Sequence, residues 1–500
     1  MMTLPMNFLD DLMHHSRMQP ERAAIVMESG RCVDWGQFGA GVRAARSAIR
    51  RNGIAHEDLV SLECSDPIWR LSLLCALMRE GICVINSSPE TTALSAGLGA
   101  RIFLCDHASA PPPDLLPHDA RLLRVDDAWF LPPAGDPPVG PDLVGDNQVA
   151  YEHGCPAIVF FTSGTTGVPA ARAFSFDHFN IGLSRRQTLF SHIDCRRVLV
   201  IPDAASAIGL NSIFASMMSG RTVFCVKTIH APKAIGLYRI EFLIASTYLI
   251  NAIVDTLKNT RLPSETIRAV WFGGGVASPE LLAAITTYMT PNILNVYGST
   301  EANTTAIMPF PAAGQALGMA GVVAPGKKIS IVDEDGAPVA NETPGEIWVQ
   351  SDHLAMPFVS RTQRVEPEPG HVFRTGDIGH IDHDGHLVVT GRKSDFINLG
   401  GVRFLPDAIE NFLVNERGIE DAAAVSILPR DGMIEELHIF VVTRTRDPDE
   451  LKQDLHVKLG LARPHKLRIV ASIPRNSQGK IARGELRDAA RASQAISGDF

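Results

Sequence analysis

Short apolar segments typical of strands alternate with amphipathic segments typical of helices along most of the chain. Within the first 110 residues, strands are predicted at Leu59–Leu62, Ile82–Asn86 and Ile102–Cys105, and helices at Gly36–Arg51 and Ile68–Glu80. The alternation resumes at Ala157, with further strands predicted near Val198–Ile201, Thr222–Val226, Ala269–Phe272 and Ile293–Val296. Strands that alternate with helices form parallel sheets covered by helices, so the pattern restricts the fold to α/β, with layered sheets.

Three parts of the chain depart from this alternation. Residues 111–143 hold three consecutive prolines and two further proline pairs, which predicts an exposed connecting loop. After about residue 315, two Asp-Gly turns flank a strand at Glu346–Gln350, which predicts a small antiparallel, β-barrel-like unit. The last hundred residues mix a helix at Pro406–Val414 with strands at Ala422–Ile427 and Leu437–Thr443, which predicts a small α+β C-terminal domain.

Composition and charge narrow the class of protein. Five hundred residues with 45% hydrophobic side chains exceed one compact domain, and a net charge of −9 argues against a nucleic-acid binder. The last fifty residues are locally basic, which suits either a solvated surface or a polyanionic substrate.

Cysteine usage and the N-terminus bear on the compartment. All eight cysteines lie between Cys32 and Cys225 without a C-x-x-C pair, which is typical of proteins that keep reduced thiols. The segment MMTLPMNFLDDLMHH lacks the features of a signal peptide, and no apolar stretch is long enough to span a bilayer. We therefore expect a cytoplasmic protein with no membrane span.

The segment TSGTTGVP, residues 162–169, directly follows the apolar run Ala157–Phe161. Its small residues expose backbone N–H groups and hydroxyls on a loop that extends from a buried strand. Such a loop can wrap a phosphate chain, although an ordinary Ser/Thr/Gly turn has the same composition. It is not a Walker A loop, because no Gly-Lys-Ser/Thr follows at the required spacing.

Two later segments carry candidate binding groups on turns. NVYGSTEAN offers an aromatic face at Tyr297, a hydroxyl at Thr300 and a carboxylate at Glu301 that could hold Mg²⁺. The alternative is a capped turn after a strand. FRTGDIG places Asp377 on a predicted tight turn, where its carboxylate could accept both hydroxyls of a ribose, or where it forms an ordinary hairpin turn.

Two segments near the C-terminus carry candidate cations. GRKSDFINLGG contains Arg392, which can donate to ribose or phosphate, at a place that suits either a hinge or a charged interdomain loop. PRNSQGKIARGEL presents Lys480 on a turn before a predicted helix, either as a mobile point charge or as an ordinary surface lysine.

The joint order and spacing of TSGTTGxP, YGxTE, TGD, GRxxDxI and PRxxxGKI resemble the adenylate-forming, or AMP-binding, superfamily. That superfamily includes acyl- and aryl-CoA ligases, adenylation enzymes that load carrier proteins, and beetle luciferase. The resemblance extends from about residue 20 to residue 490. It implies an N-terminal AMP-binding domain at 1–391 with its β-rich subdomain at 315–391, a hinge at 392–394, and a mobile C-terminal domain at 395–500.

The resemblance also implies a role for each matching residue. The β- and γ-phosphates of ATP would lie against Thr162, Ser163, Gly164, Thr165, Thr166 and Gly167. Gly273, Gly274 and Gly275 would line adenine and the acyl group, Tyr297 would stack on adenine, and Asp377 would hold the ribose with Arg392 beside it. Thr300 would contact the α-phosphate, Glu301 would ligate Mg²⁺, and Lys480 would bridge the substrate carboxylate and the α-phosphate.

These residue types suit the attack of a carboxylate on the α-phosphorus of ATP. The main obstacle is charge repulsion, which Mg²⁺ on Glu301 and the ammonium of Lys480 would offset. No general base is needed, because a carboxylate is already ionised near neutral pH. A thiol would then displace AMP, after the C-terminal domain rotates about the hinge at Ser394 and carries Lys480 away.

Three regions differ from the usual pattern of this superfamily. Ala170 stands where the phosphate loop usually continues with lysine, which removes a cation that Arg172 could replace. Ser394 replaces the usual hinge Asp or Lys, and a hinge needs backbone freedom more than charge. In the predicted acyl pocket, Ser206 replaces a frequent histidine, and Ala207 stands where amino-acid-activating members place an aspartate.

The acyl pocket, to which Gly209 and Gly273 also belong, is expected to hold an apolar acyl or aryl tail. An uncompensated α-ammonium beside Ala207 would be costly, although Asp203 nearby keeps an amino acid open as an alternative.

The leading interpretation is an AMP-forming acyl- or aryl-CoA ligase that uses ATP, Mg²⁺ and coenzyme A on a small carboxylic acid. The alternative within the class is a stand-alone adenylation enzyme that loads a phosphopantetheinyl acyl carrier protein in trans. A non-catalytic nucleotide-binding protein, suggested by Ala170, is the alternative from a different class.

Overall fold

The computed structural model describes residues 7–131, 151, 154–162, 169–260, 262–275, 277, 279–309, 318–365, 367, 370–393, 397–399, 402–404, 406–414, 416, 418–427, 436–459, 465–475 and 481–496. Residue contacts divide the chain into two compact units. The first unit contains the described residues up to 328 together with 349–373, and the second contains 329–348 and the described residues from 374 onward.

One sheet of the first unit has seven strands, in the order β18-β8-β7-β4-β3-β5-β6. The strands are β3 (Leu59–Leu62), β4 (Cys83–Asn86), β5 (Ile102–Cys105), β6 (Arg121–Arg124), β7 (Pro156–Thr162), β8 (Ala170–Ser175) and β18 (Met356–Pro357). In β4, Val84 packs into the core beneath the helices, whereas Cys83 and Ile85 pack with Phe358 on the opposite face. Because both faces are covered, the strand is apolar throughout rather than alternating.

A second sheet contributes nine strands to the first unit, in the order β15-β14-β13-β12-β11-β9-β10-β1-β2. They are β1 (Ala23–Met27), β2 (Cys32–Asp34), β9 (Arg197–Val200), β10 (Thr222–Cys225), β11 (Phe242–Ser246), β12 (Ala269–Gly273), β13 (Ile293–Ser299), β14 (Asn303–Pro309) and β15 (Met319–Val323). The strands from β13 to β1 pair in parallel, whereas β14, β15 and β2 pair antiparallel with their neighbours.

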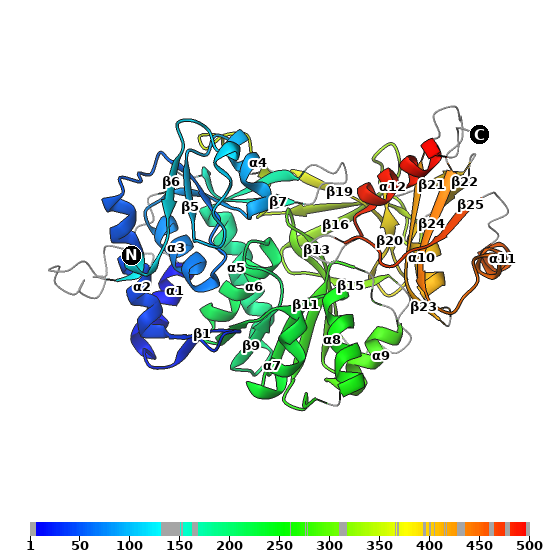
Figure 1. Ribbon diagram of the computed structural model, residues 1–500, viewed down its shortest axis with the longest axis horizontal. Coiled ribbons are helices and arrows are strands. Elements are labelled where there is room, and N and C mark those ends of the chain that lie inside the picture. The colour runs from blue at the N-terminus through cyan, green and yellow to red at the C-terminus, as the bar shows by residue number, and fades with distance from the viewer. Residues whose placement is uncertain are drawn as a thin grey trace. The chain divides into compact units, whose positions relative to one another are not determined.

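The helices of the first unit lie in layers against these sheets (Figure 1). One core cluster joins both sheets to α1 (Phe8–Met18), α2 (Trp35–Arg51), α3 (Pro67–Arg79), α5 (Phe176–Ser191) and α6 (Ala207–Met218). A second cluster packs α7 (Ala231–Leu237), α8 (Thr247–Thr260) and α9 (Pro279–Tyr288) on the other face of the larger sheet. Short helices are α4 (Thr92–Gly97), η1 (Pro89–Thr91), η2 (Pro113–Leu115), η3 (Asp127–Phe130) and η4 (Thr228–His230).

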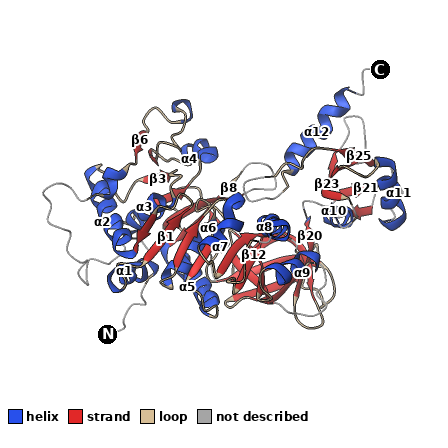
Figure 2. Cartoon of the chain, turned by 60° about the horizontal axis from the view of Figure 1, so that its bottom comes forward, coloured by secondary structure: helices blue, strands red, loops and turns tan. Residues whose placement is uncertain are grey.

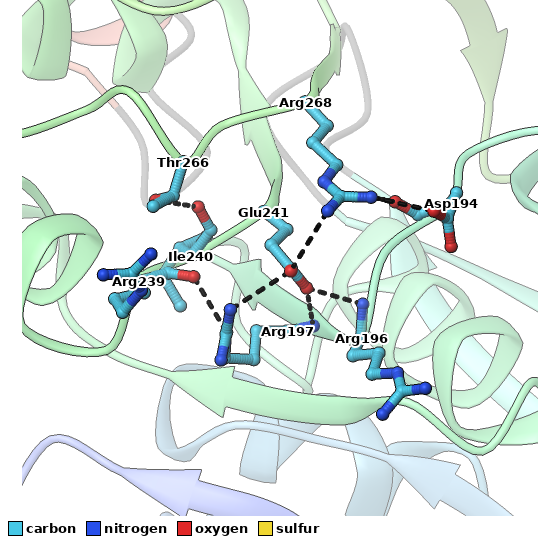
Figure 3. Close-up of polar contacts among 8 residues, drawn as sticks. All are labelled: Asp194, Arg196, Arg197, Arg239, Ile240, Glu241, Thr266 and Arg268. Carbon is cyan, nitrogen blue, oxygen red and sulfur yellow. Dashed lines mark hydrogen bonds and ion pairs between the residues drawn. The ribbon is translucent and has the colours of Figure 1, made fainter.

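A buried carboxylate, Glu241, ties together the amino ends of β9, β11 and β12 (Figure 3). Its Oε2 accepts hydrogen bonds from the backbone N–H groups of Arg196 at 2.7 Å and Arg197 at 3.0 Å, and its Oε1 contacts the guanidinium of Arg268 at 3.9 Å. Burial alone would raise the pKa of Glu241, but the hydrogen bonds from these two backbone groups, together with the charges of Arg197 and Arg268, outweigh it and hold the pKa below its usual value.

The second unit contains an antiparallel β region and a small α+β region (Figure 2). In the first, β16 (Lys327–Val332), β17 (Gly345–Ser351), β19 (Val372–Ile381) and β20 (Leu387–Arg392) pair in that order. The strand ends at 327–328, 349–351 and 372–373 belong to the first unit. The second contains β21 (Ile397–Leu399), β22 (Val402–Phe404), β23 (Ile419–Ile427), β24 (Glu436–Thr443) and β25 (His465–Ile469). Helices α10 (Pro406–Val414) and α11 (Pro448–Leu459) cover one face of β23–β25, and α12 (Arg483–Ile496) covers the other.

The predicted α/β class with layered sheets is confirmed, and the predicted bounds of β3, β5 and α10 match the structure. Two local expectations are wrong. Residues 121–124 form strand β6 inside the predicted proline-rich loop, because Leu122 and Leu123 pair with β5. The TGD segment lies within strand β19 rather than on a tight turn. Gly376 adopts a φ of 72°, which glycine tolerates, and the strand continues past it.

All eight cysteines carry thiols and form no disulfide, as expected. Among the helices that the structure describes, none is long and apolar enough to cross a membrane. The domain and hinge boundaries at 391 and 394 stay predictions.

Candidate active site

Three parallel strands, β11, β12 and β13, bring the predicted adenine-binding residues to one edge of the larger sheet. Their register pairs Ser246 with Gly273 and Gly273 with Val296, so Gly274 and Tyr297 follow at the same carboxyl edge. A Cβ on Gly273 would lie 2.3 Å from the carbonyl oxygen of Val296, so only glycine allows this approach. Carboxyl edges of parallel sheets are where ligands bind in open α/β folds.

The segment that carries Thr300 and Glu301 is the turn of a hairpin between β13 and β14. Ser299 pairs with Asn303 across the hairpin, and Asn303 has a φ of 54°, a left-handed conformation that asparagine tolerates better than most residues. The backbone carbonyl of Glu301 accepts a hydrogen bond from the N–H of Ala355 at 2.8 Å. The backbone of Glu301 is therefore fixed both by the strand pairing of its hairpin and by the hydrogen bond from Ala355.

An ion pair joins this hairpin to the strand that leaves the predicted phosphate loop. Arg172 Nε donates to Glu301 Oε1 at 2.9 Å, and the two side chains are 25% and 13% exposed. Arg172 lies on β8, whose first residue, Ala170, pairs with Thr162 at the end of β7. The strand after the predicted phosphate loop thus meets the YGxTE hairpin through two residues that lie 129 positions apart in the chain.

The two ends of the predicted phosphate loop, at Thr162 in β7 and Ala170 in β8, are paired with each other. Thr162 Oγ1 donates to the carbonyl of Ala170 at 3.2 Å, which closes the two strand ends against each other. The predicted phosphate-binding residues Ser163, Gly164, Thr165, Thr166 and Gly167 lie outside the described residues.

The predicted acyl-pocket segment forms the start of helix α6. Ser206 is its N-cap: the hydroxyl accepts from the N–H of Gly209 at 3.1 Å and donates to the carbonyl of Asp203 at 2.6 Å. A Cβ on Gly209 would lie 2.0 Å from that same carbonyl, so the helix start requires glycine there. Ala207 is buried, whereas Asp203 is exposed and its carboxylate accepts from the N–H of Ala205 at 2.6 Å.

Two buried polar residues that the motif analysis missed support this segment. Arg70 of α3 donates to Asn86 Oδ1 at 2.7 Å, and Asn86 Nδ2 donates to the carbonyls of Ala204 at 2.9 Å and Ala205 at 3.1 Å. The signal in the sequence is an arginine in the middle of the mostly apolar helix PIWRLSLLCALMR, because an arginine is rarely buried without a polar partner.

A second supporting group, Arg186, lies between helix α6 and the Glu301 hairpin. This buried residue of α5 donates to Ser212 Oγ at 2.9 Å and contacts Thr304 Oγ1 at 3.5 Å. Burial lowers the pKa of Arg186 to about 10, so the guanidinium still carries its charge at neutral pH.

The predicted ribose-binding pair lies in the second unit. Asp377 and Arg392 are directly opposite each other in the β19–β20 hairpin, with Arg392 Nε 3.2 Å from Asp377 Oδ1. The N–H of Asp377 donates to Thr375 Oγ1 at 3.0 Å, and Thr375 donates to the carbonyl of Ile347 at 2.7 Å. The predicted hinge residue Ser394 and the predicted catalytic residue Lys480 lie outside the described residues.

Comparison with known proteins identifies the family. Residues 12–358 match the AMP-binding enzyme family. The chain belongs to this family. A fatty acid–acyl-carrier-protein ligase from Streptomyces coeruleorubidus is 24% identical, over 95% of this chain and 94% of the relative. A 2-succinylbenzoate–CoA ligase from Geobacillus kaustophilus is 26% identical, over 94% of this chain and 95% of the relative.

A solved structure shares the fold. The o-succinylbenzoate coenzyme A synthetase of Bacillus subtilis, in complex with ATP and magnesium ion, superimposes with a TM-score of 0.77 at 20% identity. The superposition covers 96% of this chain and 99% of that chain. Together these findings confirm the predicted membership of the adenylate-forming enzymes, and the chain is an enzyme of the AMP-forming ligase type.

Proposed function

We propose that this enzyme uses ATP to convert a carboxylic acid to an acyl-AMP and then transfers the acyl group to the thiol of coenzyme A. The observation that carries this proposal is the contact between Arg172 and Glu301, which brings the phosphate-loop strand to the YGxTE hairpin. The carboxyl edge with Gly274 and Tyr297 continues from that same hairpin. Both ligases named above join an acid to a thiol carrier, which supports the reaction class.

The side chains around Glu301 fit a magnesium ion. Glu301 offers carboxylate oxygens and the adjacent Thr300 offers a hydroxyl, which are the hard oxygen ligands that Mg²⁺ prefers. When bound there, Mg²⁺ would neutralise charge on the phosphates of ATP.

Each predicted residue would then act on the nucleotide or the acid. Tyr297 stacks on adenine, Asp377 accepts the ribose hydroxyls, and Thr300 donates to the α-phosphate. Lys480 places its ammonium between the substrate carboxylate and the α-phosphate, where the two anions repel each other most strongly. Residues 395–500 then rotate about 392–394 and take Lys480 away before the thiol attacks.

The buried groups at the start of α6 support an apolar acid. Ala204 and Ala207 are buried and Leu210 is fully buried, so this segment offers no charge to an α-ammonium. The Asp203 carboxylate is exposed and already accepts a hydrogen bond within its own loop. We therefore propose an acyl or aryl acid without an amino group.

Pyrophosphate exchange tests the first half of the proposal. The enzyme should incorporate labelled pyrophosphate into ATP with at least one apolar acid of a carboxylate panel, and it should prefer that acid to the matching α-amino acid. Absence of exchange with every acid would favour the non-catalytic alternative instead.

The thiol acceptor is a separate question, because one relative is named for an acyl carrier protein and the other for coenzyme A. With the active acid, product analysis in the presence of coenzyme A or of a holo-carrier protein decides between them. Thioester on coenzyme A supports the proposal, whereas thioester on the carrier alone supports the alternative enzyme that loads a carrier in trans.

A further inference from the structure

A polar cluster that includes none of the predicted site residues gathers at the start of β16 and the end of β17, in the first unit. Lys327 Nζ donates to Ser351 Oγ at 2.8 Å and lies 3.1 Å from His353 Nε2. On the other side of the imidazole, Asp352 Oδ1 lies 2.9 Å from His353 Nδ1, and Arg185 of α5 lies 2.6 Å from Asp352 Oδ2. We call these five residues the Lys327 cluster.

The charges of the Lys327 cluster do not balance. Asp352 is paired with Arg185, so its charge is already compensated. The partners of Lys327 are a hydroxyl and an imidazole, and the described part of the chain offers its ammonium no carboxylate at ion-pair distance. Burial, and next the charge of Lys327, lower the pKa of His353 to about 3, so the imidazole is neutral near pH 7. Burial, and next the charge of Arg185, lower the pKa of Lys327 to about 7.

A cavity of about 530 Å³ opens beside the Lys327 cluster. Its polar lining includes His178, Lys327, Lys328, Ser351, Asp352 and His371. Among the described residues of this lining, basic side chains therefore outnumber the one carboxylate, which is paired with Arg185. The volume lies within the range of small-molecule sites in proteins, roughly 300–1,000 Å³.

We propose that this recess binds the phosphate group of a small phosphorylated molecule, with Lys327 and Lys328 as its cationic contacts. A partly buried ammonium without a counter-ion is costly, and a bound anion would remove that cost. Two ammonium groups and the hydroxyl of Ser351 match the charge and the acceptor oxygens of a phosphate. His353 is a positioning residue, because its neutral ring contacts the Lys327 ammonium and fixes its direction without adding or compensating charge.

The inference does not depend on the proposed acyl-CoA ligase reaction. Two sources could supply the phosphate group: the 3′-phosphate and diphosphate of a coenzyme A molecule, or free phosphate and pyrophosphate. The probes are therefore 3′-phosphoadenosine 5′-phosphate, inorganic phosphate and pyrophosphate, each titrated calorimetrically into the full-length enzyme without added Mg²⁺.

We expect at least one probe to bind, and Lys327→Met to weaken that binding about tenfold or more. Lys327→Arg, which keeps the charge, should retain most of the affinity, and Lys258→Met, which removes an exposed lysine of α8, should change nothing. Lys328→Met should weaken the same binding and does not alter the Lys327 cluster. It therefore tests the proposal even if Lys327→Met folds poorly. ATP affinity should be the same in all four variants.

Proton uptake gives an independent readout. Phosphate binding should favour the charged form of Lys327, so titrations above pH 7 in two buffers of different ionisation enthalpy should show uptake of a fraction of a proton. Among the described residues, the groups that face Lys327 are Arg185 and His178 from α5, Lys328 from β16, Asp352 and His353 after β17, and His371 before β19. Lys327→Met should abolish the uptake.

The outcomes separate the sources. Binding of the adenosine bisphosphate but not of the two inorganic anions assigns the recess to a nucleotide such as that of coenzyme A. Binding of phosphate or pyrophosphate at equal strength assigns it to small oxyanions. The proposal is overturned if none of the three probes binds, or if Lys327→Met and Lys328→Met leave their affinities unchanged.

Discussion

Replacing Arg172 tests whether this arginine and Mg²⁺ compete for the same carboxylate. The guanidinium lies 2.9 Å from Glu301, and neither side chain is more than about a quarter exposed, at 25% and 13%. A charge-assisted hydrogen bond in such surroundings contributes roughly 1.5–3 kcal/mol, and an exposed ion pair contributes about 0–1 kcal/mol. For this half-buried pair we take about 1.5 kcal/mol.

That energy sets the expected change in metal affinity. If Mg²⁺ must displace Arg172 from Glu301, removing the arginine should tighten Mg²⁺ binding by about tenfold, because 1.4 kcal/mol corresponds to a factor of ten. If Arg172 then turns to the phosphates and replaces the cation missing at Ala170, the same substitution should weaken ATP binding once Mg²⁺ is saturating.

Calorimetric ATP titrations of Arg172→Met at a series of free Mg²⁺ concentrations measure both effects without a known acid. We expect the Mg²⁺ concentration for half-maximal ATP affinity to fall, and the limiting ATP affinity to fall as well. Arg172→Lys, which keeps a cation, serves as the control and should restore the limiting affinity. An unchanged or higher Mg²⁺ requirement in Arg172→Met would refute the competition.

Three further predictions concern the chemistry and the framework. Lys480→Ala should abolish most adenylation while thioester formation from preformed acyl-AMP survives, and equal loss of both half-reactions would remove Lys480 from its assigned role. Glu241→Gln should lower the free energy of unfolding by roughly 1–2 kcal/mol at pH 7 in urea titrations. Because the folded pKa of Glu241 lies below the unfolded value of about 4.3, its stabilisation is present above that pH and is lost as the pH falls through the folded pKa, so the difference between variant and wild type should shrink in acid. Gly209→Ala should destabilise the start of α6, because the added Cβ would lie 2.0 Å from the Asp203 carbonyl oxygen. Faster hydrogen exchange limited to residues near 203–212 would support this prediction, and unchanged exchange there would contradict it.

The sequence predicted the parts of the fold that local patterns determine. Strands such as β3 and β5 are apolar and flanked by turn residues, and their bounds were predicted correctly. The strand β6, RLLR, was missed because two apolar residues between two arginines carry little signal without the partner strand β5. The position of Asp377 within a strand was missed because Gly-Asp is far more common in turns than in strands.

The candidate site was predicted through motifs, and its supporting contacts were not. The convergence of the phosphate-loop strand with Glu301 was implied by the family resemblance, but the ion pair of Arg172 depends on a side chain outside the usual motif. Arg70 and Asn86 hold the segment before α6 through contacts between positions 16 to 119 residues apart, which no local pattern contains. The position of Lys327, with no carboxylate partner among the described residues, likewise arises only when the start of β16, the end of β17 and α5 come together within the first unit.

The central claim is that separate motifs of this chain surround one ATP so that its α-phosphorus can accept the oxygen of an acid. A crystal structure with an acyl-sulfamoyl adenosine, a stable mimic of the acyl-adenylate, tests it most directly. The account predicts adenine stacked on Tyr297, ribose hydroxyls on Asp377, and the acyl group beside Gly273 and Ala207. A nucleoside bound away from both Tyr297 and Asp377 would contradict it.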